Sequence, residues 1–201
     1  MLKRLADRSC GDCTACCEFI PIRSPELDKP SNTLCPHCLR GRGCTVYEVR
    51  PQPCRGWYCG WFFLADLGSE WHPSSSGVVL RPEAIENDAM TVVILRRSAF
   101  LLSEAFAGAI GAWVAAGVTV SFERVGPAGH LPAKTEMNGL LAPAIQQRSL
   151  PELHKAFSWA IAHIDNHHRW EPDGLTLRTT LAETTNNSFQ SRSVTPFAGQ
   201  S

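Results

Sequence analysis

The sequence predicts a small, irregular, cysteine-rich module followed by a modest α+β region. All nine cysteines of the 201-residue chain lie within its first 59 residues. Prolines and glycines are frequent up to residue 63, which favours turns over long helices or strands. The following hundred residues instead alternate Val- and Ile-rich stretches with helix-like ones. The whole chain is long enough to bury a sizeable core.

Within the cysteine-rich module we expect one short regular element. The sequence "SPELDK" can begin a helix, with Ser24 as its cap and Pro25 in the first helical position. Residues 69–77, "SEWHPSSSG", form a polar connector to the second region.

The second region contains the regular elements. "GVVL" and "MTVVILRR" are rich in β-branched residues and predict strands, and "VTVSFERV" alternates like a half-buried strand. A helix is expected over 98–116, with Ser98 as its cap and Gly117 just past its end. Two further helices are expected over 139–148 and 151–168.

These elements define three parts of the chain. Residues 1–63 form the cysteine module, and residues 64–183 form the α+β region, whose role the sequence does not indicate. Residues 184–201 are polar and unpatterned and are expected to be a disordered tail.

The spacing of the cysteines favours metal chelation. A C-x2-C step makes a tight turn from which two thiolates converge on one ion at about 2.3 Å. Neighbours such as Cys16 and Cys17 project apart, so they suit different metals or different corners of a cluster. Nine thiols can satisfy two four-coordinate sites with one left over, or one polynuclear cluster and a single zinc. The candidate ligands are Cys10, Cys13, Cys16, Cys17, Cys35, Cys38, Cys44, Cys54 and Cys59. The predicted module is therefore organised by metal.

Zinc and iron both fit this pattern. C-x2-C-x2-C commonly holds three corners of an iron–sulfur cubane, although Cys17 follows here at once in place of the usual x3-C-P. Paired C-x2-C elements, one ending at Cys16 and one at Cys38, equally fit a zinc ribbon. Residues 1–59 carry nine Lys/Arg against six Asp/Glu, a net charge of +3 that can balance thiolates.

Several classes of partner and compartment are disfavoured. Neither half of the chain has the basic excess of a nucleic-acid binder. The apolar stretch 99–120 contains Glu104 and many Ala and Gly residues, so we expect a buried helix and strand and no membrane span. No apolar run follows the basic residues near the amino terminus, so a cytoplasmic location is expected. Cysteines in a reducing compartment are more often ligands than disulfides. A protein partner, of a kind that the sequence does not specify, is compatible with this pattern.

The stretch "CTVYEVRPQPCRGWYC", taken with "CGDCTACC" and "CPHC", resembles the CxxCxxCC-type zinc- or iron-chelating family, the YkgJ-like cysteine-cluster proteins. The first four cysteines match the family's opening, and Cys35 matches its mid-region cysteine. Cys38 is the position that the pattern does not require, and Cys59 is a trailing thiol. The resemblance covers residues 10–63 and implies metal chelation without a settled catalytic activity. Its closing stretch is matched by Cys44, Val46, Tyr47, Arg50, Pro51, Cys54 and Arg55.

Two functions follow as expectations. The favoured one is a metal-binding cysteine-cluster protein that holds zinc or iron, including an Fe–S cluster as one form of the iron site, and serves as an interaction or metal-handling module. The alternative is an Fe–S oxidoreductase or a cluster-bearing protein-modifying enzyme, since similar clusters occur in flagellin lysine methylases. The sequence leaves open whether the protein is an enzyme.

Overall fold

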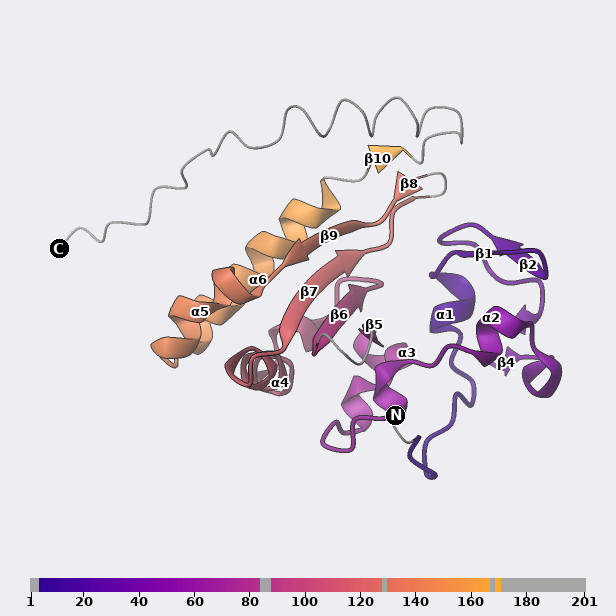
Figure 1. Cartoon of the computed structure of the whole chain (residues 1–201), viewed down its shortest axis with the longest axis horizontal. Helices are drawn as coiled ribbons and strands as arrows, with labels where there is room; N and C mark the ends of the chain where they lie inside the picture. The colour runs from indigo at the N-terminus through magenta and orange to yellow at the C-terminus, as the bar shows by residue number, and fades with distance from the viewer. Residues whose placement is uncertain (1–3, 84–87, 128–129, 167–168, 171–201) are drawn as a thin grey trace. The chain divides into compact units, whose positions relative to one another are not determined.

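The computed structural model describes residues 4–83, 88–127, 130–166 and 169–170. The chain divides into two units after Arg169, and Figure 1 shows the elements of the first unit. Both the cysteine-rich stretch and the α+β region belong to the first unit. The tail expected over 184–201 lies outside the described residues, as do residues 171–183.

A four-stranded sheet forms the framework of the first unit. Its strand order is β5 (Val78–Pro82), β6 (Ala89–Ile94), β7 (Thr119–Arg124) and β9 (Ala133–Glu136). The pair β6–β7 is parallel and the other two pairs are antiparallel. Three of these strands coincide with the predicted Val- and Ile-rich stretches. A modest α+β fold is therefore confirmed.

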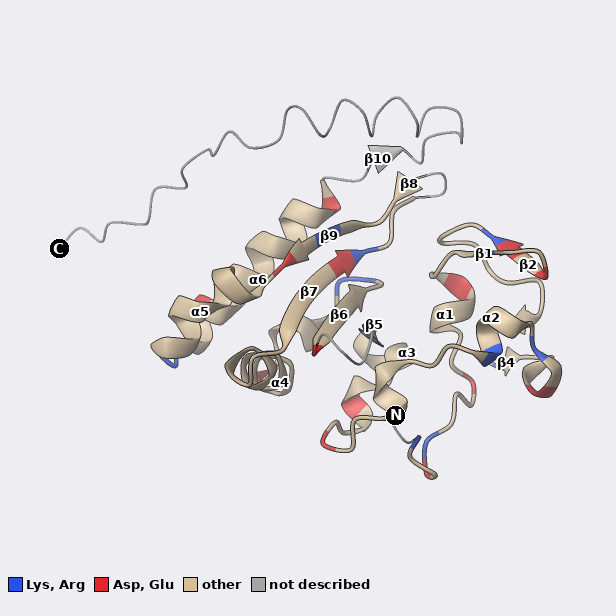
Figure 2. Cartoon of the chain, viewed as in Figure 1, with Lys and Arg blue, Asp and Glu red and all other residues tan. Residues whose placement is uncertain are grey.

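One face of the sheet packs against helices α4 (Glu104–Ala115), α5 (Asn138–Gln146) and α6 (Leu150–Asp165). Alternate strand residues such as Leu80, Val92 and Phe122 point into this core and meet Phe106 and Phe157, each at most 1% exposed. Figure 2 shows how few charges these helices carry: α4 has only Glu104 and α5 has none. The main hydrophobic core therefore lies between sheet and helices.

The predicted helix 98–116 is divided in two. A 3-10 turn, η4 (Ala99–Leu102), precedes α4, and Ser103 separates them with an extended backbone. The Ser103 hydroxyl accepts a hydrogen bond from the Phe106 amide at 3.1 Å, so Ser103 is the cap that Ser98 was expected to be. Within the described residues no helix is both long and apolar enough to cross a membrane.

The cysteine-rich stretch contains only short elements of two to four residues joined by turns, in agreement with the predicted lack of long helices and strands. Its elements are α1 (Ala15–Glu18), β1 (Ile22–Ser24), β2 (Leu27–Lys29), β3 (Cys38–Leu39), β4 (Gly43–Cys44), η1 (Tyr47–Val49), α2 (Gln52–Arg55) and η2 (Gly60–Phe62). The polar connector contains η3 (Ser69–Trp71) and α3 (Pro73–Ser76), and β8 (His130–Leu131) and β10 (Arg169–Trp170) lie beyond it.

The helix expected at "SPELDK" is wrong, because the segment forms a β-hairpin. β1 and β2 pair antiparallel around a turn at Pro25 and Glu26. The Ser24 hydroxyl accepts a hydrogen bond from the Leu27 amide at 3.1 Å, so the residue expected to cap a helix caps a turn instead. The alternation of the hairpin buries Leu27 and Lys29 and leaves Asp28 exposed.

The second face of the sheet packs against the cysteine-rich stretch. Val79, Val93 and Leu95 meet Phe62 and Cys59 in a smaller apolar cluster. Gly60 permits this close approach, since a Cβ at this position would lie 2.9 Å from the Leu80 Cβ. Trp57, Trp61 and Phe63 pack around the same cluster.

Candidate metal centre

A cavity of about 390 Å³ brings most of the cysteines to one space. It lies in the cysteine-rich stretch, and aromatic side chains that include Tyr47, Trp57 and Tyr58 form much of its wall. Eight of the nine cysteines line it: Cys10, Cys13, Cys16, Cys17, Cys35, Cys44, Cys54 and Cys59. Cys38 is buried but does not line this space.

Backbone hydrogen bonds close two of the C-x2-C segments, Cys10 to Cys13 and Cys35 to Cys38, into tight turns. The Cys13 amide donates to the Cys10 carbonyl at 2.8 Å, and the Cys38 amide donates to the Cys35 carbonyl at 3.0 Å. These are the tight turns that the spacing predicts for chelating cysteines. The Cys35 amide also donates to the Cys17 carbonyl at 2.9 Å, which ties the opening motif to the second turn.

The loops that carry the two turns also touch. Gly43, at the start of β4, has a left-handed φ of +76°, and a Cβ there would lie 2.5 Å from the Gly11 carbonyl oxygen. Only glycine fits this close contact. It places Cys44 beside the first turn, and the β3–β4 pairing aligns Cys44 with Cys38.

The cysteines pack as two groups. The first group, which we name the sheet-side thiols, contains Cys10, Cys13 and Cys59 in the apolar cluster against the sheet. The second group, the hairpin-side thiols, contains Cys17, Cys35, Cys38 and Cys54 beside Leu27 and Ile22 of the hairpin. The neighbouring Cys16 thiol, together with burial, raises the pKa of Cys17.

The thiols surround the cavity without converging on a point. Across residues 4–83 and the other described segments, no group of three or more His, Cys, Asp or Glu side chains is gathered tightly enough to hold a metal ion. Rotation of side chains toward the cavity is therefore needed before several sulfurs can meet one ion. The open ring of donors differs from the preformed site that the spacing alone suggests.

Burial keeps most of these thiols protonated near neutral pH. It raises the pKa of Cys59 to about 11 and that of Cys38 to about 12. Burial also raises the pKa of Cys10, while a hydrogen bond with Tyr47 and the charge of Arg50 act in the opposite direction. Binding of a metal to these sulfurs would consequently release protons.

The motif "VRPQPCR" contains two arginines, and Arg50 is the one that lines the cavity. It is 8% exposed, and its guanidinium lies 4.0 Å from the ring centroid of Tyr47. Its Nε donates to the Cys54 carbonyl at 3.0 Å, and its Nη2 donates to the Tyr58 hydroxyl at 2.7 Å. Arg50 therefore fixes the backbone at Cys54 and places a cation beside the thiols. Arg55, the other motif arginine, is exposed.

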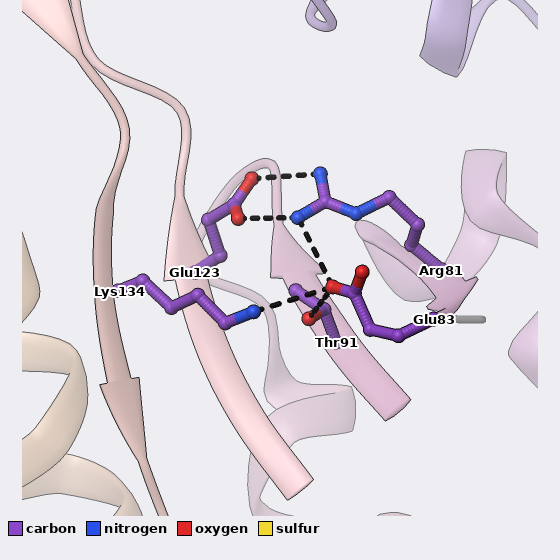
Figure 3. Close-up of polar contacts among 5 residues, drawn as sticks. All are labelled: Arg81, Glu83, Thr91, Glu123 and Lys134. Atoms are coloured by element: carbon purple, nitrogen blue, oxygen red, sulfur yellow. Dashed lines mark hydrogen bonds and ion pairs between the residues drawn. The ribbon is translucent and has the colours of Figure 1, made fainter. Parts of the chain in front are cut away.

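The α+β region also supplies cavity residues, which the sequence did not indicate. His72 and Arg81 both line the cavity, and His72 Nδ1 lies 2.7 Å from the Ser74 hydroxyl. Arg81 forms two hydrogen bonds with Glu123, at 2.6 and 3.1 Å, within a polar network on the sheet (Figure 3). Both residues follow the last cysteine, Cys59, and belong to none of the cysteine motifs, so the sequence pattern did not mark them as site residues.

The chemistry of the donors fits zinc or iron. Thiolate sulfur is the ligand that structural zinc and iron–sulfur clusters share, and eight thiols match two four-coordinate ions or one larger cluster. Every candidate ligand except Cys38 lines the common space. The residues present therefore suit the group that the sequence predicts.

Comparisons with models of known protein families, with curated proteins and with solved structures found no match for this chain.

Proposed function

We propose that the protein is a metal-binding cysteine-cluster protein of the CxxCxxCC type that holds zinc or iron. The observation that carries the proposal is the cavity lined by eight thiols from positions between 10 and 59 of the chain. Cysteines used only as small apolar residues would be spread through the core. Here they share one space, while the principal core between sheet and helices contains none of them.

Metal would also organise the cysteine-rich stretch. The hairpin-side cluster contains only Leu27, Cys35 and Cys38 as buried apolar residues. So small a core cannot offset the entropy of ordering the loops around it, whereas metal–thiolate bonds can. The role of such a module would be to present a surface or to handle the metal itself.

An electron-transferring Fe–S protein is the second candidate. The C-x2-C-x2-C spacing at Cys10, Cys13 and Cys16 favours it, and all three of these cysteines line the cavity.

Anaerobic purification followed by elemental analysis tests the proposal. We expect roughly two zinc ions per chain, or several irons with matching acid-labile sulfide. A brown colour with absorbance at about 400 nm would identify the Fe–S form. A folded protein containing neither metal would contradict the proposal.

A further inference from the structure

Lys29 is a buried cation in an unusual place. Its side chain projects from the buried side of β2 and is 1% exposed, the largest of the fully buried side chains. Its Nζ donates to the carbonyls of Thr33 at 2.9 Å and Pro30 at 3.2 Å. These two backbone carbonyl oxygens accept hydrogen bonds from the ammonium group but do not neutralise its charge.

The groups that would neutralise Lys29 are thiols. No Asp or Glu among the described residues forms an ion pair with it. Lys29 lies on the same buried side of β2 as Leu27, whose cluster includes Cys17, Cys35 and Cys54. Thiolate charges at these three cysteines and at Cys16 would stabilise the ammonium group, which burial destabilises. Three of these four are hairpin-side thiols, and all four line the cavity.

An unpaired buried ammonium group is unfavourable, and so is an uncompensated group of buried thiolates. The cost of burying either charge falls when the opposite charge lies beside it. Four thiolates on one divalent ion carry a net charge of −2, which one ammonium reduces to −1. Lys29 is thus matched to the metal-bound state of this group and mismatched to the protonated, metal-free state.

We infer that Lys29 is the built-in counter-charge of a metal centre formed by the hairpin-side thiols Cys17, Cys35 and Cys54 together with Cys44. Lys29 is a positioning residue here and not a ligand. The inference rests on the proposed function and adds to it a division of the cavity, because the sheet-side thiols have no such buried lysine among the described residues. Metal binding on the hairpin side is therefore coupled to one lysine.

Lys29→Met, Lys29→Arg and the exposed control Lys155→Met test the inference. Each protein is loaded with zinc, and zinc affinity is measured by competition with a chromophoric chelator. We expect Lys29→Met to lose about 10- to 100-fold in affinity for the hairpin-side ion, as for other groups that support metal ligands. Lys29→Arg should retain the affinity to within a few-fold, and Lys155→Met should match the wild type.

Stability of the metal-free proteins supplies a second readout. Removing an unpaired buried cation should leave the metal-free Lys29→Met protein as stable as the wild type or more so, while the loaded variant is less stable than the loaded wild type. Wild-type zinc affinity in Lys29→Met, or an equal loss in Lys29→Arg and Lys29→Met, would overturn the inference while leaving metal binding intact. Failure of the wild type to bind zinc or iron would overturn the proposed function as well.

Discussion

Individual cysteines differ in their surroundings, although the sequence presents them as nearly equivalent. Spacing predicted all nine as ligands, and the resemblance to the CxxCxxCC-type proteins marked Cys38 as the position that their pattern does not require. Cys38 is the cysteine that does not line the cavity. By contrast, His72 and Arg81 could not be predicted to line the cavity, because burial and proximity depend on contacts that no local pattern encodes. The best-supported ligands at this scale are therefore the eight cavity thiols.

Serine substitutions should separate Cys38 from the cavity thiols. Cys54→Ser removes a donor from the hairpin side and should reduce bound metal by about half if two ions are held. Cys38→Ser should retain the metal and cost only about 1 kcal/mol of stability from its buried site. Metal content after anaerobic purification measures both. Loss of metal in Cys38→Ser with full retention in Cys54→Ser would contradict the ligand assignment.

Cys16 and Cys17 should contribute separately to metal binding. Because one tetrahedral ion does not readily bind two adjacent cysteines, each single serine substitution should lower the metal content, and the double substitution should lower it further. The same elemental analysis measures all three proteins. An unchanged metal content in the double variant would show that neither thiol is a ligand.

A titration should detect the polar network on the sheet. A hydrogen bond from the fully buried Thr91 hydroxyl, at 2.5 Å, is the main reason that the pKa of Glu83 lies below its usual value of 4.5. Stability from this lowered pKa is present above about pH 4.5 and is lost as the pH falls through the pKa of the folded state. Thr91→Val should therefore raise the pKa of Glu83 toward its usual value in an NMR titration.

The exposed residue Thr119 provides the control for that titration, since Thr119→Val should leave the Glu83 pKa unchanged. A Glu83 pKa that did not respond to Thr91→Val would mean that Lys134 and Arg81, which also contact Glu83, maintain it alone.

Secondary-structure elements were predicted best where the sequence pattern is strong. The β-branched runs of β5, β6 and β7 gave correct strands, while β9, with the sequence AKTE, has no such pattern and was missed. At residues 24–29, Ser-Pro fits a helix start and a turn equally well. Burial of Leu27 and Lys29 on one side decides for the hairpin, and that burial depends on packing against the cysteines. Elements shaped by tertiary contacts were therefore beyond local prediction.

Gly60 should control how closely η2 approaches the sheet. In Gly60→Ala the new Cβ would lie 2.9 Å from Leu80 Cβ and 3.3 Å from the Leu80 carbonyl oxygen. Overpacking of this kind costs about 1–3 kcal/mol, measurable by urea denaturation. The control Gly108→Ala, in α4 with no atom within 4 Å, should instead stabilise the protein by about 0.5–1 kcal/mol. Equal stabilities of the two variants would contradict the close packing at η2.

The molecule as a whole combines a conventional core with a part that depends on cysteine chemistry. Sheet and helices bury large apolar side chains and need no metal to explain their stability. The cysteine-rich stretch has few such side chains, and its buried groups include thiols and the cations Lys29 and Arg50. We therefore expect the two parts to respond differently to chelators.

Limited proteolysis measures that difference. Addition of a strong chelator should expose sites within residues 4–63 to cleavage, because these loops lose the bonds that order them. Residues 77–165 should remain largely intact, since their core is unchanged. Uniform resistance with the metal removed would show that ordinary packing holds the cysteine-rich stretch.

Thiol titration of the native protein tests the central claim most directly. The folded, anaerobically purified protein is treated with an aromatic disulfide reagent before and after a chelator, and released metal is counted in the same sample. We predict that few of the nine cysteines react at first, and that about eight become reactive as the metal is released. Nine freely reactive thiols in a folded, metal-free protein would contradict the account.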